Sequence, residues 1–249
     1  MSNVQVEGRR PVIEALRSGR GVREVLLAEG VQPSAAVREI RELASSEGVP
    51  LRVVPRREID SLSRSQNPQG VLAFVAPRPA ESLEDVVQAA ERAGQAPLLV
   101  ALDGVTDPHN VGALARSAEA AGAHGLLLPS RRSAGVTPTV EKAAAGALAW
   151  LPVVTVDNLS RTIEWLKSAG IWTVALDGEA PGSLYDLNLA CDPLCLVVGA
   201  EGPGVSRLVA QRCDLRVHIP LRGRVGSLNA SVAGGVALFE VARRRSGGS

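Results

Sequence analysis

The sequence predicts an α/β protein made of two consecutive parts, and three observations carry this prediction. Apolar, strand-like runs alternate with amphipathic, helix-like stretches along most of the 249 residues. The runs in the second part are apolar at nearly every position, as in strands of a mostly parallel sheet with helices on both faces. A stretch rich in proline and charge, residues 77–82, separates the parts. We expect a small α/β domain over 1–77, a linker and first helix over 78–96, and a larger domain over 97–249.

The first part has the pattern of a small α/β module with three strands and three helices. The predicted strands are 22–27, 51–54 and 71–76. The predicted helices are 11–16, 35–46 and a short one near Glu58.

The second part opens with a helix whose beginning is marked by Ser82 and Asp85. A serine followed three residues later by an acidic residue resembles a capping box, here with Asp in place of Glu. Strands are expected at 98–102, 125–128, 153–156, 172–176, 194–198 and 216–219, with helices between them and a final helix over about 229–243.

Composition excludes several classes of protein. With 45% hydrophobic and 21% charged residues and a mean hydropathy of +0.11, the chain is neither disordered nor membrane-spanning in character. The polar start lacks the pattern of a signal peptide, so we expect a cytoplasmic protein that does not enter membranes. Its three cysteines, Cys191, Cys195 and Cys213, lack the histidine or cysteine partners of a zinc site, and we expect no metal.

The net charge of +1 means that any affinity for nucleic acid must come from local patches of cations. The first 80 residues carry a small excess of arginine over acidic residues. A solvated surface explains such an excess as well as RNA binding does, so the charge is weak support for RNA.

Three ends of predicted strands have unusual polar sequences, and ligands of parallel α/β sheets bind at such ends. The first runs from Asp103 through Asn110 to Arg116, on a helix that begins near Pro108. The second is the segment GAEGPG at 199–204, whose glycines let a backbone approach a ligand closely. The third is IPLRGRVGSLNAS at 219–231, in which two arginines suit phosphate groups.

Each segment also has a purely structural explanation. The first could be a plain connecting turn, with His109 as a surface or capping residue. Glu201 could cap the next helix, and Ser227 or Asn229 could be the N-cap of the last helix. The glycine order G-x-x-G-x-G differs from the dinucleotide fingerprint, and no G-K-[ST] phosphate loop is present, which argues against nucleotide-dependent oxidoreductases and triphosphatases.

Taken together, the segments N-x-G-x-x-x-R at 110–116, GAEGPG at 199–204 and IPLRGRVGSLNAS at 219–231 resemble the three motifs of the SpoU (TrmH-like) family of SPOUT methyltransferases. The resemblance covers roughly residues 97–245. The first part, with Gln69-Gly70-Val71 leading its last strand, is similar to the small RNA-binding domain of the RlmB-type members.

The resemblance implies a deep trefoil knot at the carboxyl end of the sheet, a homodimer formed through the C-terminal domain, and S-adenosylmethionine as cofactor. General topology rules would have argued against a knot. Residues expected to bind the cofactor, through backbone and apolar contacts, are Leu176, Gly199, Ile219 and Leu228.

The implied reaction is methylation of a ribose 2′-hydroxyl, which requires aligning the hydroxyl with a sulfonium methyl and removing a proton. Arg116 is the residue expected at the attacking hydroxyl, with Asn110, Glu201, Ser227 and Asn229 ordering the site. A guanidinium stays protonated at neutral pH and is a poor base. Arg116 is therefore expected to bind the target phosphate and polarise the hydroxyl, while phosphate or water takes the proton.

The resemblance implies a structured stem-loop of ribosomal RNA as partner, most specifically a guanosine of the large-subunit RNA. The alternatives are a transfer RNA, a ribosomal site whose methylation confers antibiotic resistance, or a non-catalytic RNA-binding module. Aromatic residues make up only 2% of the chain, so recognition by phosphate and shape fits better than base stacking. Trp150, Trp165 and Trp172 are accordingly expected in the core or in dimer contacts.

Overall fold

The computed structural model describes residues 4–19, 21–63, 68–76 and 82–247 and divides the chain into two compact units. Unit 1 contains Met1–Pro79 together with Val136–Trp150, and unit 2 contains Ala80–Gly135 together with Leu151–Ser249. Of the predicted separating stretch, only Ser82 lies within the described residues. The domain boundaries expected from the sequence stay a prediction.

Unit 1 is built on a mixed four-stranded sheet with the order β1-β4-β2-β3, in which only β2 and β3 run parallel. Its strands are β1 (Val4–Glu7), β2 (Val22–Ala28), β3 (Leu51–Val54) and β4 (Val71–Val75), and its first three helices are α1 (Arg9–Arg17), α2 (Ala35–Ser46) and α3 (Arg56–Leu62). One core cluster joins α1 and α2 to one set of strand residues, while Ile59 of α3 packs against the alternate set. The sheet therefore lies between α1 and α2 on one face and α3 on the other.

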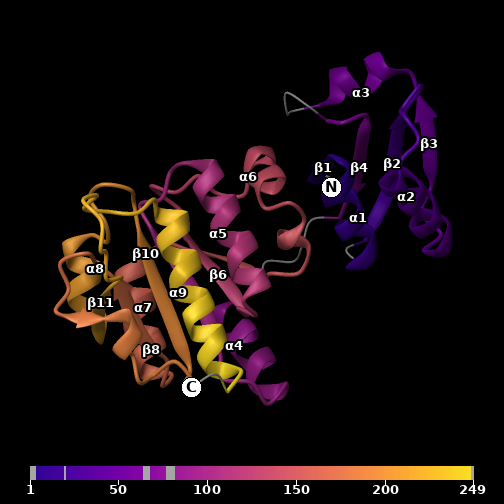
Figure 1. Ribbon diagram of the computed structural model, residues 1–249. Helices are drawn as coiled ribbons and strands as arrows, with labels where there is room; N and C mark the ends of the chain where they lie inside the picture. The colour runs from indigo at the N-terminus through magenta and orange to yellow at the C-terminus, as the bar shows by residue number, and fades with distance from the viewer. Residues whose placement is uncertain (1–3, 20, 64–67, 77–81, 248–249) are drawn as a thin grey trace. The chain divides into compact units, whose positions relative to one another are not determined.

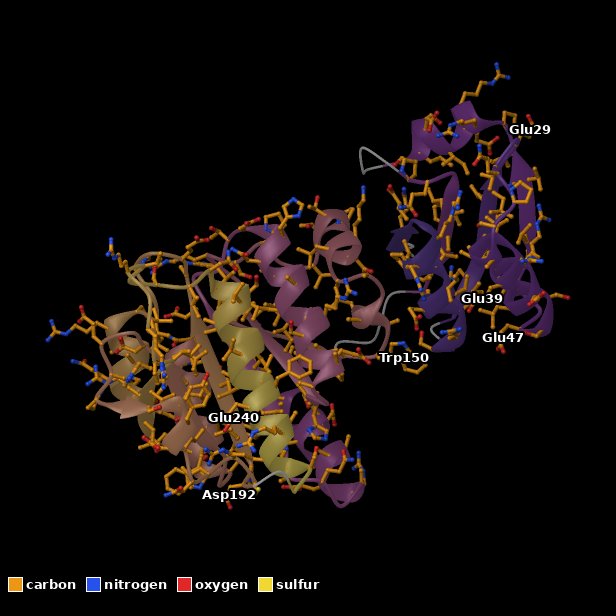
Figure 2. All side chains as sticks on the ribbon, in the orientation of Figure 1. Glu29, Glu39, Glu47, Trp150, Asp192 and Glu240 are labelled. Atoms are coloured by element: carbon orange, nitrogen blue, oxygen red, sulfur yellow. The ribbon has the colours of Figure 1, made fainter. Side chains whose placement is uncertain are left out.

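Unit 1 also includes a segment that lies far away in sequence, Val136–Trp150. It holds α6 (Pro138–Ala143) and the 3₁₀ helix η1 (Ala147–Ala149). The Trp150 indole, labelled in Figure 2, donates from Nε1 to Oε2 of Glu14 at 3.0 Å. A Cβ at Gly146 would lie only 2.4 Å from Cγ of Glu14, so the segment packs closely against α1.

Unit 2 is built on a seven-stranded sheet with the order β7-β6-β5-β10-β8-β11-β9, all of whose pairs are parallel. Its strands are β5 (Leu98–Asp103), β6 (Gly125–Pro129), β7 (Val153–Val156), β8 (Trp172–Leu176), β9 (Gly182–Ser183), β10 (Leu194–Gly199) and β11 (Leu215–His218). Its helices are α4 (Leu83–Arg92), α5 (Pro108–Ala120), α7 (Leu159–Ser168), α8 (Arg207–Arg212), α9 (Ala230–Arg245) and the 3₁₀ helix η2 (Leu184–Asp186).

Helices cover both faces of this sheet. One core cluster contains Val86 of α4, Ile163 of α7 and Val209 of α8 together with alternate strand residues such as Leu99 and Val197. On the other face, α9 crosses the sheet in front of β10 and lies beside α5 (Figure 1). The expected three-layer architecture with a parallel sheet is thus confirmed for unit 2.

Most predicted elements are confirmed to within one or two residues, including the N-terminus of α4. The Ser82 hydroxyl accepts a hydrogen bond from the Asp85 backbone N–H at 3.1 Å, and the Asp85 carboxylate accepts one from the Ser82 backbone N–H at 3.2 Å. Two short strands, β1 and β9, were not expected. Within the described residues, no helix combines the length and apolar character needed to cross a bilayer.

Candidate functional site

A hollow of about 730 Å³ opens in unit 2 at the carboxyl ends of β8, β10 and β11. The strand order reverses between β5 and β10, so the hollow lies beside the position where open α/β sheets bind ligands. Its volume falls within the roughly 300–1,000 Å³ typical of small-molecule sites. Six residues singled out from the sequence line it: Leu176, Gly199, Glu201, Ile219, Ser227 and Leu228.

The loop after β10 folds back on Gly199. Ala200 and Gly204 exchange backbone hydrogen bonds of 3.1 and 2.9 Å, and Gly202 and Gly204 adopt positive φ angles of 86° and 67°. A Cβ at Gly199 would lie 2.0 Å from the carbonyl carbon of Gly204 and 2.1 Å from the backbone nitrogen of Val205. Because these neighbours are backbone atoms, only glycine fits at 199 without moving the loop.

Asn229 connects three of the predicted site segments. Its Nδ2 donates to Oδ1 of Asn110 at 3.0 Å and to Oε2 of Glu201 at 3.2 Å. Its Oδ1 accepts from the Ser231 backbone N–H at 2.9 Å and so caps the N-terminus of α9. One amide thus orders the start of α9, the start of α5 and the loop after β10.

Close packing of α9 against α5 brings the two asparagines together. A Cβ at Gly234 of α9 would lie 2.3 Å from Cδ2 of Leu114 on α5 and 3.3 Å from Cγ2 of Val198 on β10. Asn110 itself is the third residue of α5, whose N-cap Asp107 accepts from the His109 backbone N–H at 2.9 Å. The expectation of His109 as a surface residue fits its exposed position.

The capping role that the sequence allowed holds for Asn229 but not for Glu201. Asn229 is indeed the N-cap of the last helix. Glu201 does not cap the helix that follows it, because α8 begins only at Arg207 and its N-cap is Ser206. The Ser206 backbone N–H instead donates to Oδ2 of Asp103 at 2.7 Å, which ties this loop to the end of β5.

Arg116 is not brought to the hollow. It lies on the exposed side of α5, makes no ion pair within the described residues and does not line the cavity. The prediction that a helix beginning at Pro108 carries both Asn110 and Arg116 is confirmed. Within the described part of the chain, the Asn110 side chain bonds to Asn229 and no hydrogen bond joins it to Arg116.

The lining also contains polar residues that the sequence interpretation did not single out. Asp177 follows β8 directly, and its Oδ2 accepts from Nη1 of Arg216 at 3.3 Å, while Nδ1 of His218 lies 2.9 Å from the Ala180 carbonyl oxygen. Asp177 and His218 had a signal of position, since Asp177 follows the end of β8 and His218 ends β11. These residues belong to no recognisable sequence motif, and position at a strand end alone does not identify a functional residue.

At the amino ends of β8 and β11, hydrogen bonds between Thr173 and Asp214 join the two strands. Thr173, which is fully buried, donates from Oγ1 to Oδ2 of Asp214 at 2.7 Å, and the Asp214 backbone N–H donates back to that hydroxyl at 3.0 Å. Nζ of Lys167 lies 2.9 Å from Oδ1 of Asp214. Burial alone would raise the pKa of Asp214, but hydrogen bonds from Thr173 and Lys167 outweigh it and lower that pKa.

The cysteines are free thiols. Burial, reinforced by the neighbouring Asp214 carboxylate, raises the pKa of Cys213 to about 12. Burial also raises the pKa of Cys195, which is completely enclosed in the core. Within the described residues, no three His, Cys, Asp or Glu side chains gather as a metal site.

The tryptophans have mixed environments. Trp165 packs against the core of unit 2, as expected. Trp150 and Trp172 are 47% and 42% exposed, so neither is a core residue of the chain as described.

Two family models match this chain. The model described as the SpoU rRNA Methylase family matches residues 97–239, and that described as RNA 2′-O ribose methyltransferase substrate binding matches residues 5–80. The 23S rRNA (guanosine-2′-O-)-methyltransferase RlmB of Pseudomonas aeruginosa is 44% identical over 224 residues, covering 90% of this chain and 89% of the relative. YacO of Bacillus subtilis, named provisionally as a TrmH family tRNA/rRNA methyltransferase, is 42% identical over 240 residues, covering 96% and 95%.

Solved structures with the same fold include the SpoU methyltransferase AviRb from Streptomyces viridochromogenes in complex with AdoMet (S-adenosylmethionine). The TM-score is 0.82 at 28% identity, with 99% of this chain and 92% of AviRb covered. An AdoMet-bound rRNA methyltransferase from Sinorhizobium meliloti gives a TM-score of 0.76 at 27% identity, with 97% and 87% covered.

Proposed function

Because this chain belongs to the SpoU rRNA methylase family and is an S-adenosylmethionine-dependent RNA 2′-O-methyltransferase, we propose that its substrate is a guanosine of 23S ribosomal RNA. The observation that carries the choice of substrate is the 44% identity to RlmB across both parts of the chain. A ribosomal substrate also makes the cytoplasm the expected location.

The hollow at the ends of β8, β10 and β11 fits the cofactor. Its lining combines apolar side chains, Leu176, Ile219 and Leu228, with loop backbone that Gly199 allows to turn tightly. The apolar side chains suit an adenine ring, and the backbone groups suit the polar parts of the cofactor. When bound, S-adenosylmethionine supplies a methyl group already activated by its sulfonium charge.

The chain's own task is then to position the ribose and to assist removal of its proton. Asn110, Glu201 and Asn229 form one hydrogen-bonded group beside the hollow, and Ser227 lines the hollow itself. We assign these four to ordering the loops around the acceptor hydroxyl. Arg116 holds the phosphate of the target nucleotide and polarises the hydroxyl as a fixed cation.

The exposed position of Arg116 fits a site completed by a second copy of the chain, and we assign the homodimer to the C-terminal unit. Val232 and Phe239 lie two turns apart on α9 and are 50% and 52% exposed, with Val236 between them. A row of exposed apolar side chains on one helix face is typical of a protein interface. Phe239→Glu is expected to convert a dimer into monomers in light scattering, whereas an unchanged mass would remove α9 from the interface.

The family's trefoil knot is proposed for the loops at 199–206 and 219–229. Both loops line the same hollow, and Asn229 at the end of one contacts Glu201 of the other. A crystal structure with S-adenosylmethionine tests the threading and the cofactor contacts together.

The deciding experiment is methyl transfer from labelled S-adenosylmethionine to protein-free 23S rRNA and to bulk tRNA, followed by mapping of the 2′-O-methyl group. Arg116→Ala is compared with Arg161→Ala, which removes an exposed arginine of α7 away from the hollow. Label on one 23S guanosine that only Arg116→Ala abolishes supports the proposal.

Other outcomes select the alternatives. Label on tRNA keeps the chemistry and replaces the substrate. Label at a ribosomal site whose methylation blocks an antibiotic makes the protein a resistance enzyme. Cofactor binding without label on either free RNA or ribosomal particles leaves a non-catalytic RNA-binding protein.

A further inference from the structure

Unit 1 contains a hollow of its own, of about 550 Å³, that the methyl-transfer site does not use. It is lined by residues from four places in the chain: Arg9 at the start of α1, Gly30 to Gln32 after β2, Arg56 at the start of α3, and Gln69 before β4. Two lining side chains are cations and none is acidic. The hollow therefore has the charge of an anion site.

Arg9 lines this hollow and has one donor without a partner within the described residues. Its Nη1 donates to Oγ of Ser34 at 3.2 Å, and its backbone N–H donates to Oε1 of Gln69 at 3.2 Å. Its Nε is buried and has no hydrogen-bond partner within the described residues. Buried guanidinium N–H groups are normally paired, so the Arg9 side chain has hydrogen-bonding capacity that the described residues do not fill.

The turn that carries Gln69 is held in a strained conformation. Gln69 has a φ of 55°, which side-chain-bearing residues seldom adopt, and Gly70 follows with a φ of 70°. A Cβ at Gly70 would lie 2.5 Å from Cγ2 of Val31, which lines the same hollow. In this conformation the Gln69 side-chain oxygen accepts from the first N–H of α1, and such local strain is often found at ligand sites.

We propose that this hollow binds a phosphate of the RNA backbone. Arg9 and Arg56 are the main hydrogen-bond donors to the phosphate oxygens. Guanidinium groups match phosphate geometry and can donate to two phosphate oxygens at once. The site lies within residues 5–80, matched by the substrate-binding family model. The proposal rests on the proposed function only in taking RNA as the source of the phosphate.

Acidic neighbours do not neutralise the hollow. Asp60 lies 4.0 Å from Nε of Arg56, but both side chains are more than half exposed, so this pair is weak and easily exchanged. Glu29, labelled in Figure 2, precedes Gly30 on an exposed loop and does not line the cavity.

The test measures filter binding of radiolabelled, protein-free 23S rRNA and bulk tRNA over a range of salt concentrations. The variants are Arg56→Ala and Arg9→Gln, and the matched control is Arg57→Ala, which removes an exposed arginine next to the site. Each site variant is expected to weaken binding by roughly tenfold and to lower the salt slope by about one. Arg57→Ala is expected to stay within about twofold of wild type, as a solvated charge outside the site.

Methyl transfer separates this proposal from the proposed function. With a site variant, KM for RNA should rise while kcat at saturating RNA and the Kd for S-adenosylmethionine stay unchanged. If no RNA is methylated but the binding differences remain, the proposed function fails and the phosphate site stands.

Three results would overturn the site. In the first, the Arg56→Ala variant binds RNA with the same affinity as Arg57→Ala; the Arg56 side chain is exposed, so its loss should not prevent folding. In the second, inorganic phosphate raises the Tm of wild type but not of the site variants, while RNA binding is equal in all. In the third, wild type binds neither RNA.

Discussion

Replacing Asn229 by alanine tests whether one amide joins the segments of the candidate site. The substitution removes the N-cap of α9, which costs about 0.5–2 kcal/mol. It also leaves Oδ1 of Asn110, a residue only 8% exposed, without the 3.0 Å hydrogen bond from Asn229, and an unsatisfied buried acceptor costs about 1–3 kcal/mol. Glu201 is exposed and regains water, so its lost contact adds little. We expect a total loss of about 2–4 kcal/mol in the free energy of unfolding.

The chain offers a matched control in Asn158, the N-cap of α7, whose Oδ1 accepts from the Arg161 backbone N–H at 3.1 Å. Asn158→Ala removes a cap alone and should cost about 1 kcal/mol. Urea unfolding followed by circular dichroism at equal protein concentration compares the two variants with wild type. Equal losses for Asn229→Ala and Asn158→Ala would refute the idea that Asn229 does more than cap its helix.

Three further predictions concern the loop after β10, the hydrogen bonds between Thr173 and Asp214, and the Cys213 thiol. Gly199→Ala should abolish S-adenosylmethionine binding in calorimetry, because the added Cβ meets Gly204 backbone at 2.0 Å; retained affinity would mean that the loop moves freely. The pKa of Asp214 is lower in the folded state than in the unfolded state. Its contribution to the free energy of unfolding is therefore fully present above the unfolded pKa of about 3.9 and is lost as pH falls through the folded pKa. The loss in unfolding free energy caused by Asp214→Asn should therefore be larger at pH 7 than at pH 3; urea titrations showing the opposite order contradict the role of the Thr173 hydrogen bonds. Because burial raises the pKa of Cys213 to about 12, its thiol should resist a disulfide reagent at pH 8 until the chain unfolds, as peptide mass spectrometry would show.

The elements of the fold were predictable wherever local chemistry specified them. Ser82 and Asp85 marked the start of α4, and continuous apolar runs marked buried parallel strands. Strand β1 was missed because its pairing with β4 is long-range, and a four-residue run with alternating polar side chains carries little local signal. Strand β9 has two residues, too few for any periodicity.

The candidate site was predictable where residues of a recognisable sequence motif follow the end of a strand. Glycines and an asparagine marked the loop after β10 and the start of α9, and the structure brings Asn110, Glu201 and Asn229 into one hydrogen-bonded group. The partnership of Asp103 with the Ser206 backbone was not predictable, because it joins positions 103 residues apart through a side chain that has many possible partners. Nor could spacing along α5 tell that Arg116 is exposed and does not line the hollow.

The division of the chain into units limits how the two units can be separated from each other. Since Val136–Trp150 belongs to unit 1, the chain passes between the units three times, near residues 80, 136 and 151. A fragment starting at Ala80 would strip Val140 and Leu148, which are 0% and 4% exposed, of the partners that bury them. Residues 1–79 of this chain therefore do not form a complete N-terminal unit, and a chimaera that exchanges unit 1 has to carry Val136–Trp150 as well.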